Sequence, residues 1–133
     1  MSQENLEVVR RAFEAFAAQG PQAMVDYWDP EIELWLPSGL IQAGGTYRGH
    51  TAVLKWMKEW ADAWEEIDYT PEEFTEAGDS VLVRVLYEGR GKGGGVRVEG
   101  RFWYLLKLRN GMLLSWRLYP DKAEALEAAG LRE

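Results

Sequence analysis

The chain has no cysteine and a single histidine among its 133 residues. These absences exclude disulfides, thiolate nucleophiles and thiolate metal sites, and they leave a histidine-rich metal centre without ligands. We therefore expect neither a metal nor a cofactor. No apolar run approaches the roughly 20 residues that span a bilayer, and the first residues lack the basic and apolar regions of a signal peptide. A cytoplasmic location without membrane contact is predicted.

Basic residues are also outnumbered: the chain has 15 Lys and Arg and 22 Asp and Glu, and its net charge is −7. Nucleic-acid binding needs clustered basic side chains, so a nucleic-acid partner is not expected. Hydrophobic residues make up 47% and charged residues 28%, which is typical of a globular protein. A chain of this length is too short for two cores, and one domain over residues 1–133 is predicted.

Aromatic residues are abundant, with seven tryptophans and six tyrosines. An indole is costly to bury unless its neighbours match its shape and its N–H finds a partner. Several of these side chains are therefore expected to line a cavity. The alternative is that they fill an ordinary core.

Apolar residues at helical spacing predict helices over residues 2–19, 21–28 and 50–64. Between the last two, the alternation at 31–36 predicts a strand, and the glycine-rich segment 37–49 is interpreted as a loop.

The second half of the chain predicts four strands and a final helix. The strands are expected at residues 67–76, 80–90, 96–109 and 112–119. Asp121, with Glu124 three residues later, is interpreted as the cap of a short C-terminal helix. These elements define an α+β fold: three N-terminal helices packed on a curved antiparallel sheet.

The dipeptide Asn110-Gly111 is a strong signal for a tight hairpin. A two-residue loop there would pair Leu105 with Trp116 and Tyr104 with Arg117. One face of the hairpin would then carry Trp103, Leu105, Leu114, Trp116 and Leu118. The other would carry Phe102, Tyr104, Leu106 and Leu108, which is too apolar to leave in water. We interpret this second face as the surface of a homodimer.

Local segments along nearly the whole chain resemble one known group of proteins. They are Glu4–Phe13, Tyr27–Glu33, Tyr47–His50, Glu72–Asp79 and the hairpin at 109–111. Together they are similar to the SnoaL-like polyketide cyclase group of the nuclear-transport-factor-2-like superfamily. The resemblance implies a cone-shaped domain with a ligand between the helices and the concave sheet face. It does not imply one activity, because the fold hosts isomerases, cyclases, hydrolases and non-catalytic binders.

The resemblance also places the candidate ligand-binding residues. Those on elements around the cone are Trp35, Trp56, Trp60, Trp103, Trp116 and Phe16. Flat indoles there would stack on a planar apolar or aromatic ligand. Trp35 stands where relatives often carry a proton-accepting histidine, and Trp103, Tyr104 and Leu106 also depart from the pattern of relatives. These enlarged aromatics are compatible with a pocket engineered on a natural scaffold.

Three residues are candidates for acid–base chemistry. The Tyr104 phenol can donate or accept a hydrogen bond, and Glu33 or Glu99 would become a base if its strand pointed it into an apolar cavity. His50 is interpreted as a helix-start residue. Two functions follow: a small-molecule pocket protein with proton-transfer activity of the isomerase, lyase, cyclase or hydrolase type, or a non-catalytic ligand-binding or dimerisation module.

Overall fold

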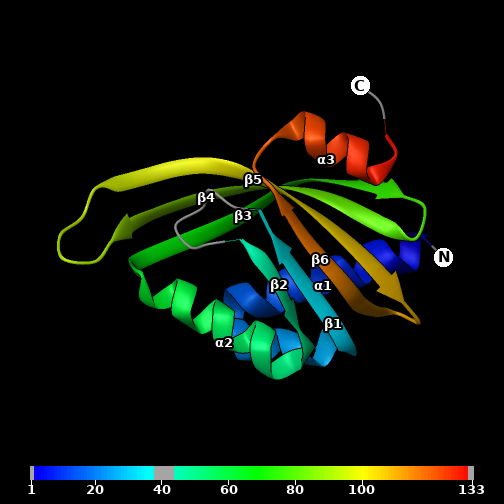
Figure 1. The fold of residues 1–133 in the computed structure, drawn as a ribbon, viewed down its shortest axis with the longest axis horizontal. Coiled ribbons are helices and arrows are strands. Elements are labelled where there is room, and N and C mark those ends of the chain that lie inside the picture. The colour runs from blue at the N-terminus through cyan, green and yellow to red at the C-terminus, as the bar shows by residue number, and fades with distance from the viewer. Residues whose placement is uncertain (1, 38–43, 132–133) are drawn as a thin grey trace.

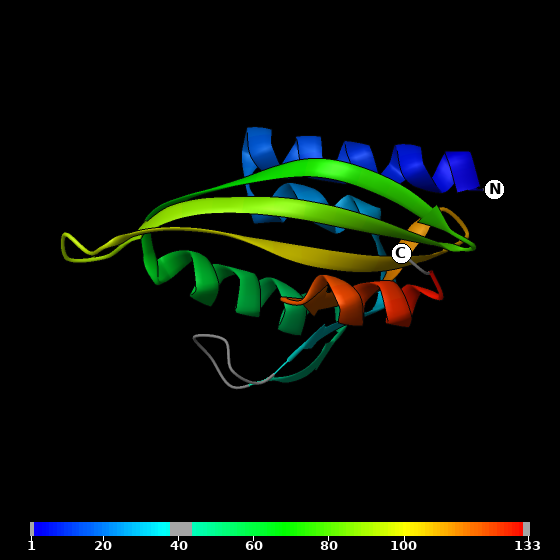
Figure 2. The same ribbon diagram turned by 90° about the horizontal axis from the view of Figure 1, so that it is seen from above.

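A curved six-stranded sheet with helices on both faces makes up the structure, a computed structural model that describes residues 2–37 and 44–131 (Figures 1 and 2). The strand order is β2-β1-β6-β5-β4-β3. The helices are α1 (Ser2–Gln19), the 3₁₀ helix η1 (Pro21–Tyr27), α2 (Gly49–Asp62) and α3 (Lys122–Ala129). The strands are β1 (Trp28–Leu36), β2 (Gly45–Arg48), β3 (Trp64–Ala77), β4 (Ser80–Gly91), β5 (Arg97–Arg109) and β6 (Met112–Tyr119).

The expected α+β architecture is confirmed, with one difference in the sheet. β1 lies parallel to β6, whereas every other pair of neighbouring strands in the sheet runs antiparallel. The sheet is therefore mixed. The segment that was expected to be a loop contains strand β2. It is a short edge strand that pairs with residues 33–36 of β1. Residues 38–43 of that expected loop lie outside the described part of the chain.

Helix α2 ends at Asp62, so Trp64 begins β3 and does not continue the helix as predicted. Its ring packs over the neighbouring strand β4 at Gly89. A Cβ atom at Gly89 would lie 3.0 Å from the Trp64 ring and 2.9 Å from the carbonyl oxygen of Glu66. The absence of a side chain at this strand position lets the indole approach the backbone.

A bulge in the last hairpin decides which side chains face the helices. Leu108 pairs with Leu113, but the next pair is Lys107 with Ser115, so Leu114 is an extra residue in β6. The pairing before the bulge follows the predicted two-residue turn, since Arg109 faces Met112. Beyond it the predicted register is wrong by one residue, because a single inserted residue moves every later side chain to the opposite face.

As a result, Trp116 pairs with Leu106 and shares its face. The predicted dimer face was composed of Phe102, Tyr104, Leu106 and Leu108, and this assignment is wrong. All four side chains are buried in the main core, under the helices. Their apolar character is explained by helix packing.

The opposite face of the sheet carries a second, smaller core under α3 (Figure 1). Its buried members are Leu82, Leu105, Tyr119 and Ala125, with Trp35 and Trp103 packed against them. Asp121 caps α3 as predicted, because its carboxylate accepts the Ala123 N–H at 2.7 Å. We call this side the outer face and the side under α1 and α2 the inner face.

Candidate functional site

A cavity of about 210 Å³ lies between the inner face of the sheet and the helices α1, η1 and α2. None of the described residues that line it carries a charged side chain. They are Val9, Ala12, Phe13, Phe16, Pro21, Met24, Trp28, Ile32, Trp56, Met57, Trp60, Ala61, Ile67, Tyr69, Phe102, Tyr104, Leu106, Leu113, Trp116 and Leu118. The wall is therefore apolar apart from phenol and indole groups.

The lining follows from the periods of the elements. Helix α1 contributes positions 9, 12, 13 and 16, which fall on one face of a helix. β5 contributes positions 102, 104 and 106, because alternate residues of a strand point to the same side. The bulge at Leu114 adds Trp116 and Leu118 of β6 to this wall.

One end of the cavity is closed and the other is open to solvent. Trp28, Ile32 and Val9 are at most 1% exposed. At the other end Ala61 is exposed, and Pro21, Ile67 and Tyr69 are only half-buried. These residues lie where the C-terminal ends of α1 and α2 approach the start of β3 (Figure 2). We assign the mouth of the cavity to this end.

Aromatic rings form flat walls inside the cavity. Trp56 stacks on Trp60 with ring centroids 5.7 Å apart and meets Trp116 edge to face at 6.3 Å. Trp116 in turn meets Tyr104 at 5.4 Å. Such surfaces favour planar ligands that stack on them.

Two tyrosines bring hydroxyl groups to this wall. The Trp60 indole N–H donates to the Tyr69 hydroxyl oxygen. No described residue hydrogen-bonds the hydroxyl of Tyr104, which is 8% exposed. Burial raises the pKa of Tyr69 to about 12 and the pKa of Tyr104 further, so both phenols are neutral at physiological pH.

Four buried indole nitrogens have no hydrogen-bond partner within the described ranges: those of Trp28, Trp56, Trp64 and Trp116. Three of these residues line the cavity. The hydrogen-bonding side chains of the wall are therefore mainly donors, since an indole N–H cannot accept.

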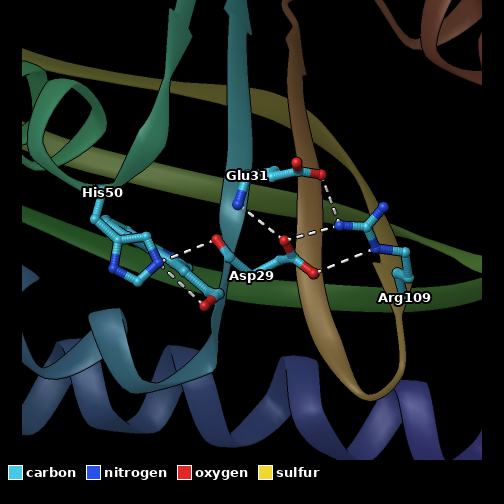
Figure 3. Close-up of polar contacts among 5 residues, drawn as sticks. Asp29, Glu31, His50 and Arg109 are labelled. Carbon is cyan, nitrogen blue, oxygen red and sulfur yellow. Dashed lines mark hydrogen bonds and ion pairs between the residues drawn. The ribbon is translucent and has the colours of Figure 1, made fainter.

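A polar clamp holds the closed end of the cavity (Figure 3). The Asp29 carboxylate accepts the Glu31 N–H at 2.8 Å and binds the Arg109 guanidinium through both oxygens. The His50 Nε2–H donates to the carbonyl oxygens of Trp28 and Asp29, at 3.1 and 3.0 Å. Since carbonyls only accept, this geometry assigns the proton to Nε2. The clamp fixes β1 and hence the ring of Trp28.

The structure brings together most of the candidate ligand-binding residues. Phe16, Trp56, Trp60 and Trp116 all line the cavity. Trp35 and Trp103 do not, and their expected place in its wall is wrong. Both side chains lie on the outer face of the sheet, where Trp35 contacts the Tyr119 ring and the Arg117 guanidinium.

Of the candidate acid–base residues, only Tyr104 reaches the cavity. Glu33 and Glu99 are exposed, on the outer-face positions of β1 and β5, so neither points into the apolar cavity as the candidate role of a base requires, and both are wrong as candidates at this site. Glu33 instead binds Arg48 at 3.1 Å. His50 belongs to the polar clamp, where it binds the carbonyl oxygens of Trp28 and Asp29.

Sequence reasoning missed Trp28 and Tyr69 as cavity residues. Tyr69 lies two residues after Ile67 in β3, so both side chains point to the same side of the strand. This alternation could have placed Tyr69 in the cavity wall. No sequence pattern pointed to Trp28, because this residue was assigned to the end of a helix and in fact begins β1.

Among the described residues, no group of three or more His, Asp or Glu side chains is arranged to hold a metal ion. No helix among the described residues is both long and apolar enough to cross a membrane.

A family model for the SnoaL-like domain matches residues 9–116. The chain belongs to the SnoaL-like domain family. Its fold is that of NTF2-like proteins. An NTF2-like protein from Burkholderia xenovorans LB400 is 30% identical over 97% of each chain, with a TM-score of 0.76.

Two further solved structures share the fold at lower identity. TerC, crystallised with polyporic acid, is 21% identical with a TM-score of 0.79, and the match covers 96% of this chain and 98% of TerC. A protein from Jannaschia sp. CCS1, assigned as a SnoaL-like polyketide cyclase, is 18% identical with a TM-score of 0.77, over 99% and 95% of the two chains. No curated protein matches the sequence.

Proposed function

We propose that this protein binds a small planar apolar or aromatic molecule in the inner-face cavity. The observation that carries the proposal is the cavity itself, about 210 Å³ in volume and walled by stacked indoles. A cavity of about 150 Å³ lined by apolar side chains is large enough for benzene. The volume therefore suits a ligand of one or two fused rings.

The cavity supports binding better than acid–base catalysis. Proton abstraction needs a base with a pKa near the working pH. The described lining has no carboxylate or imidazole, and its two phenols remain protonated. We therefore propose a non-catalytic ligand-binding role. TerC, which shares the fold, was crystallised with an organic compound, polyporic acid, and this supports a ligand-binding role for the present chain.

Calorimetric titration with indane, a neutral two-ring hydrocarbon, tests the proposal. We expect saturable binding by the wild type with one site per chain. Ala12→Leu should abolish it, because Ala12 is a buried member of the cavity wall and a larger side chain fills the space. Ala17→Leu is the matched control, since Ala17 is exposed on the same helix. Absence of indane binding by the wild type would overturn the proposal.

We also propose a homodimer, but we assign its interface to the outer face of the sheet and no longer to the face that carries Phe102 and Leu106. Leu86 and Trp103 are half-buried on the outer face, beside the pair that Glu72 forms with Arg101 at 2.7 Å. We expect a second copy to cover this surface, so that Leu86→Asp weakens self-association in sedimentation experiments. A wild type that is monomeric at micromolar concentration would contradict this. The cytoplasmic location and an engineered origin of the pocket stay predictions of the sequence.

A further inference from the structure

We propose that the cavity selects neutral ligands that carry a carbonyl oxygen on an otherwise apolar ring system, and that the Tyr104 and Tyr69 hydroxyls bind this oxygen. The inference rests on the proposed binding function and adds the chemical class of the ligand. It follows from the hydrogen-bonding state of the two tyrosines.

Two aromatic neighbours pack against the Tyr104 ring. Phe13 stacks on it at 6.1 Å with an interplanar angle of 12°, and Trp116 meets it at 5.4 Å with an angle of 66°. The hydroxyl group has no hydrogen-bond partner among the described residues, although the residue is buried in the cavity wall. The hydroxyl is not one of the fully buried unpaired polar atoms, which among the described residues are four indole nitrogens, so it is open to the cavity and can donate to an acceptor atom of a ligand.

Tyr69 is prepared to donate in the same way. Its oxygen accepts the Trp60 N–H, and this leaves its own proton available. Phe16 meets the Tyr69 ring edge to face at 5.5 Å. Since Phe13 and Phe16 lie one turn apart on α1, successive turns of this helix hold the two tyrosines on the same wall.

The chemistry of the wall excludes other ligand classes. Both phenols remain protonated because burial raises their pKa values, so they offer O–H donors over the physiological range. The other polar side chains of the wall are indole N–H donors. A carboxylate ligand would lose its hydration without gaining a cation, because the described lining has no Lys or Arg. A ketone, quinone or ester satisfies the donors without this loss.

The matched ligands indane and 1-indanone test the inference, because they differ by one carbonyl oxygen. We expect wild type to bind 1-indanone about three to ten times more tightly than indane, the range of one net hydrogen bond. Tyr104→Phe keeps the ring and should remove most of this preference, measured as the ratio of the two dissociation constants within the same variant. Tyr119→Phe, on the outer face, is the control and should keep the full preference.

Infrared spectroscopy of carbonyl-labelled 1-indanone supplies a second readout that needs no variant. On binding to wild type, the carbonyl band should move to lower frequency than in a hydrocarbon solvent, and Tyr104→Phe should reverse part of the shift. Equal affinity for the two ligands with an unshifted band would overturn the inference and leave the binding function standing. Binding of neither ligand would overturn both.

Discussion

Arg109 binds Asp29 across 80 residues of sequence, with its terminal nitrogen 3.0 Å from Oδ1 and its Nε 3.3 Å from Oδ2. The contact joins the tip of the β5–β6 hairpin to the start of β1. It lies at the one place where the sheet is parallel, between β1 and β6. Because the next residue toward the cavity is Trp28, this pair helps to fix the closed end of the ligand site.

The first prediction concerns stability in acid. The Glu31 N–H and the Arg109 guanidinium lower the pKa of Asp29 in the folded protein. The contribution of Asp29 to stability is then fully present above its ordinary pKa near 4 and is lost as the pH falls through the lower folded value. We expect Asp29→Asn to reduce the free energy of unfolding at pH 7 and to flatten its decline below pH 4.

Urea unfolding between pH 7 and pH 3 measures this effect. Glu33→Gln serves as the control, because it removes an exposed ion pair with Arg48 that is expected to contribute little. An Asp29→Asn variant whose stability falls as steeply in acid as that of wild type would contradict the prediction.

The second prediction separates two tryptophans that the sequence does not distinguish. Trp116 is 6% exposed and contacts both Trp56 and Tyr104 in the cavity wall, whereas Trp35 is half-buried on the outer face. Trp116→Ala should cost about 3–5 kcal/mol of unfolding free energy and change indane affinity. Trp35→Ala should cost less and leave indane affinity unchanged. Chemical denaturation and calorimetry check both variants, and the reverse ranking would refute the assignment of faces.

The third prediction concerns alkaline pH. Burial raises the pKa of Tyr69 to about 12 and that of Tyr104 further, whereas both titrate near 10 in the unfolded chain. Their contribution to stability is present below pH 10 and is lost as the pH rises toward the folded values, by at most about 1.4 kcal/mol per pH unit for each phenol. In Tyr104→Phe this alkaline decline should be smaller. Unfolding curves from pH 8 to pH 11 measure it, and an identical decline in the variant would speak against a buried phenol.

The fourth prediction concerns the two carboxylates proposed from sequence. Glu33 and Glu99 are exposed and do not line the cavity. Glu33→Gln and Glu99→Gln should therefore change the indane dissociation constant by less than about twofold, because neither side chain contacts the bound ligand. Calorimetric titration of each variant measures the constant. A tenfold change for either would show that the site extends beyond the cavity described here.

Much of the fold could be predicted from the sequence because its elements have strong local signals. The stripes of α1 and α2, the Asn110-Gly111 turn and the Asp121 cap each follow from nearby residues. Asn110 and Gly111 both have positive φ, as a tight hairpin turn requires. The parallel pairing of β1 with β6 has no such local signal, since it joins distant segments.

The site was predicted less completely, and the reason is one residue. The inserted Leu114 changes the register of β6 against β5. No pattern in the hairpin marks that insertion, because apolar residues occur on both faces of these strands. The error exchanged the inner and outer faces of β5, so that Trp103 was placed in the cavity and Leu106 on a dimer surface. Helix residues such as Trp56 and Trp60 were placed correctly, because their spacing defines a single face.

The central claim is that a small apolar molecule enters the inner-face cavity, and intermolecular nuclear Overhauser effects test it most directly. With methyl-labelled protein and unlabelled indane, we predict contacts from the ligand to methyl groups of Ala12, Ile32, Leu106 and Leu118, which line the cavity. Methyl groups of Leu82 and Leu105 on the outer face should show none. Contacts confined to the outer-face methyl groups, or the absence of any contact at saturating indane, would contradict the account.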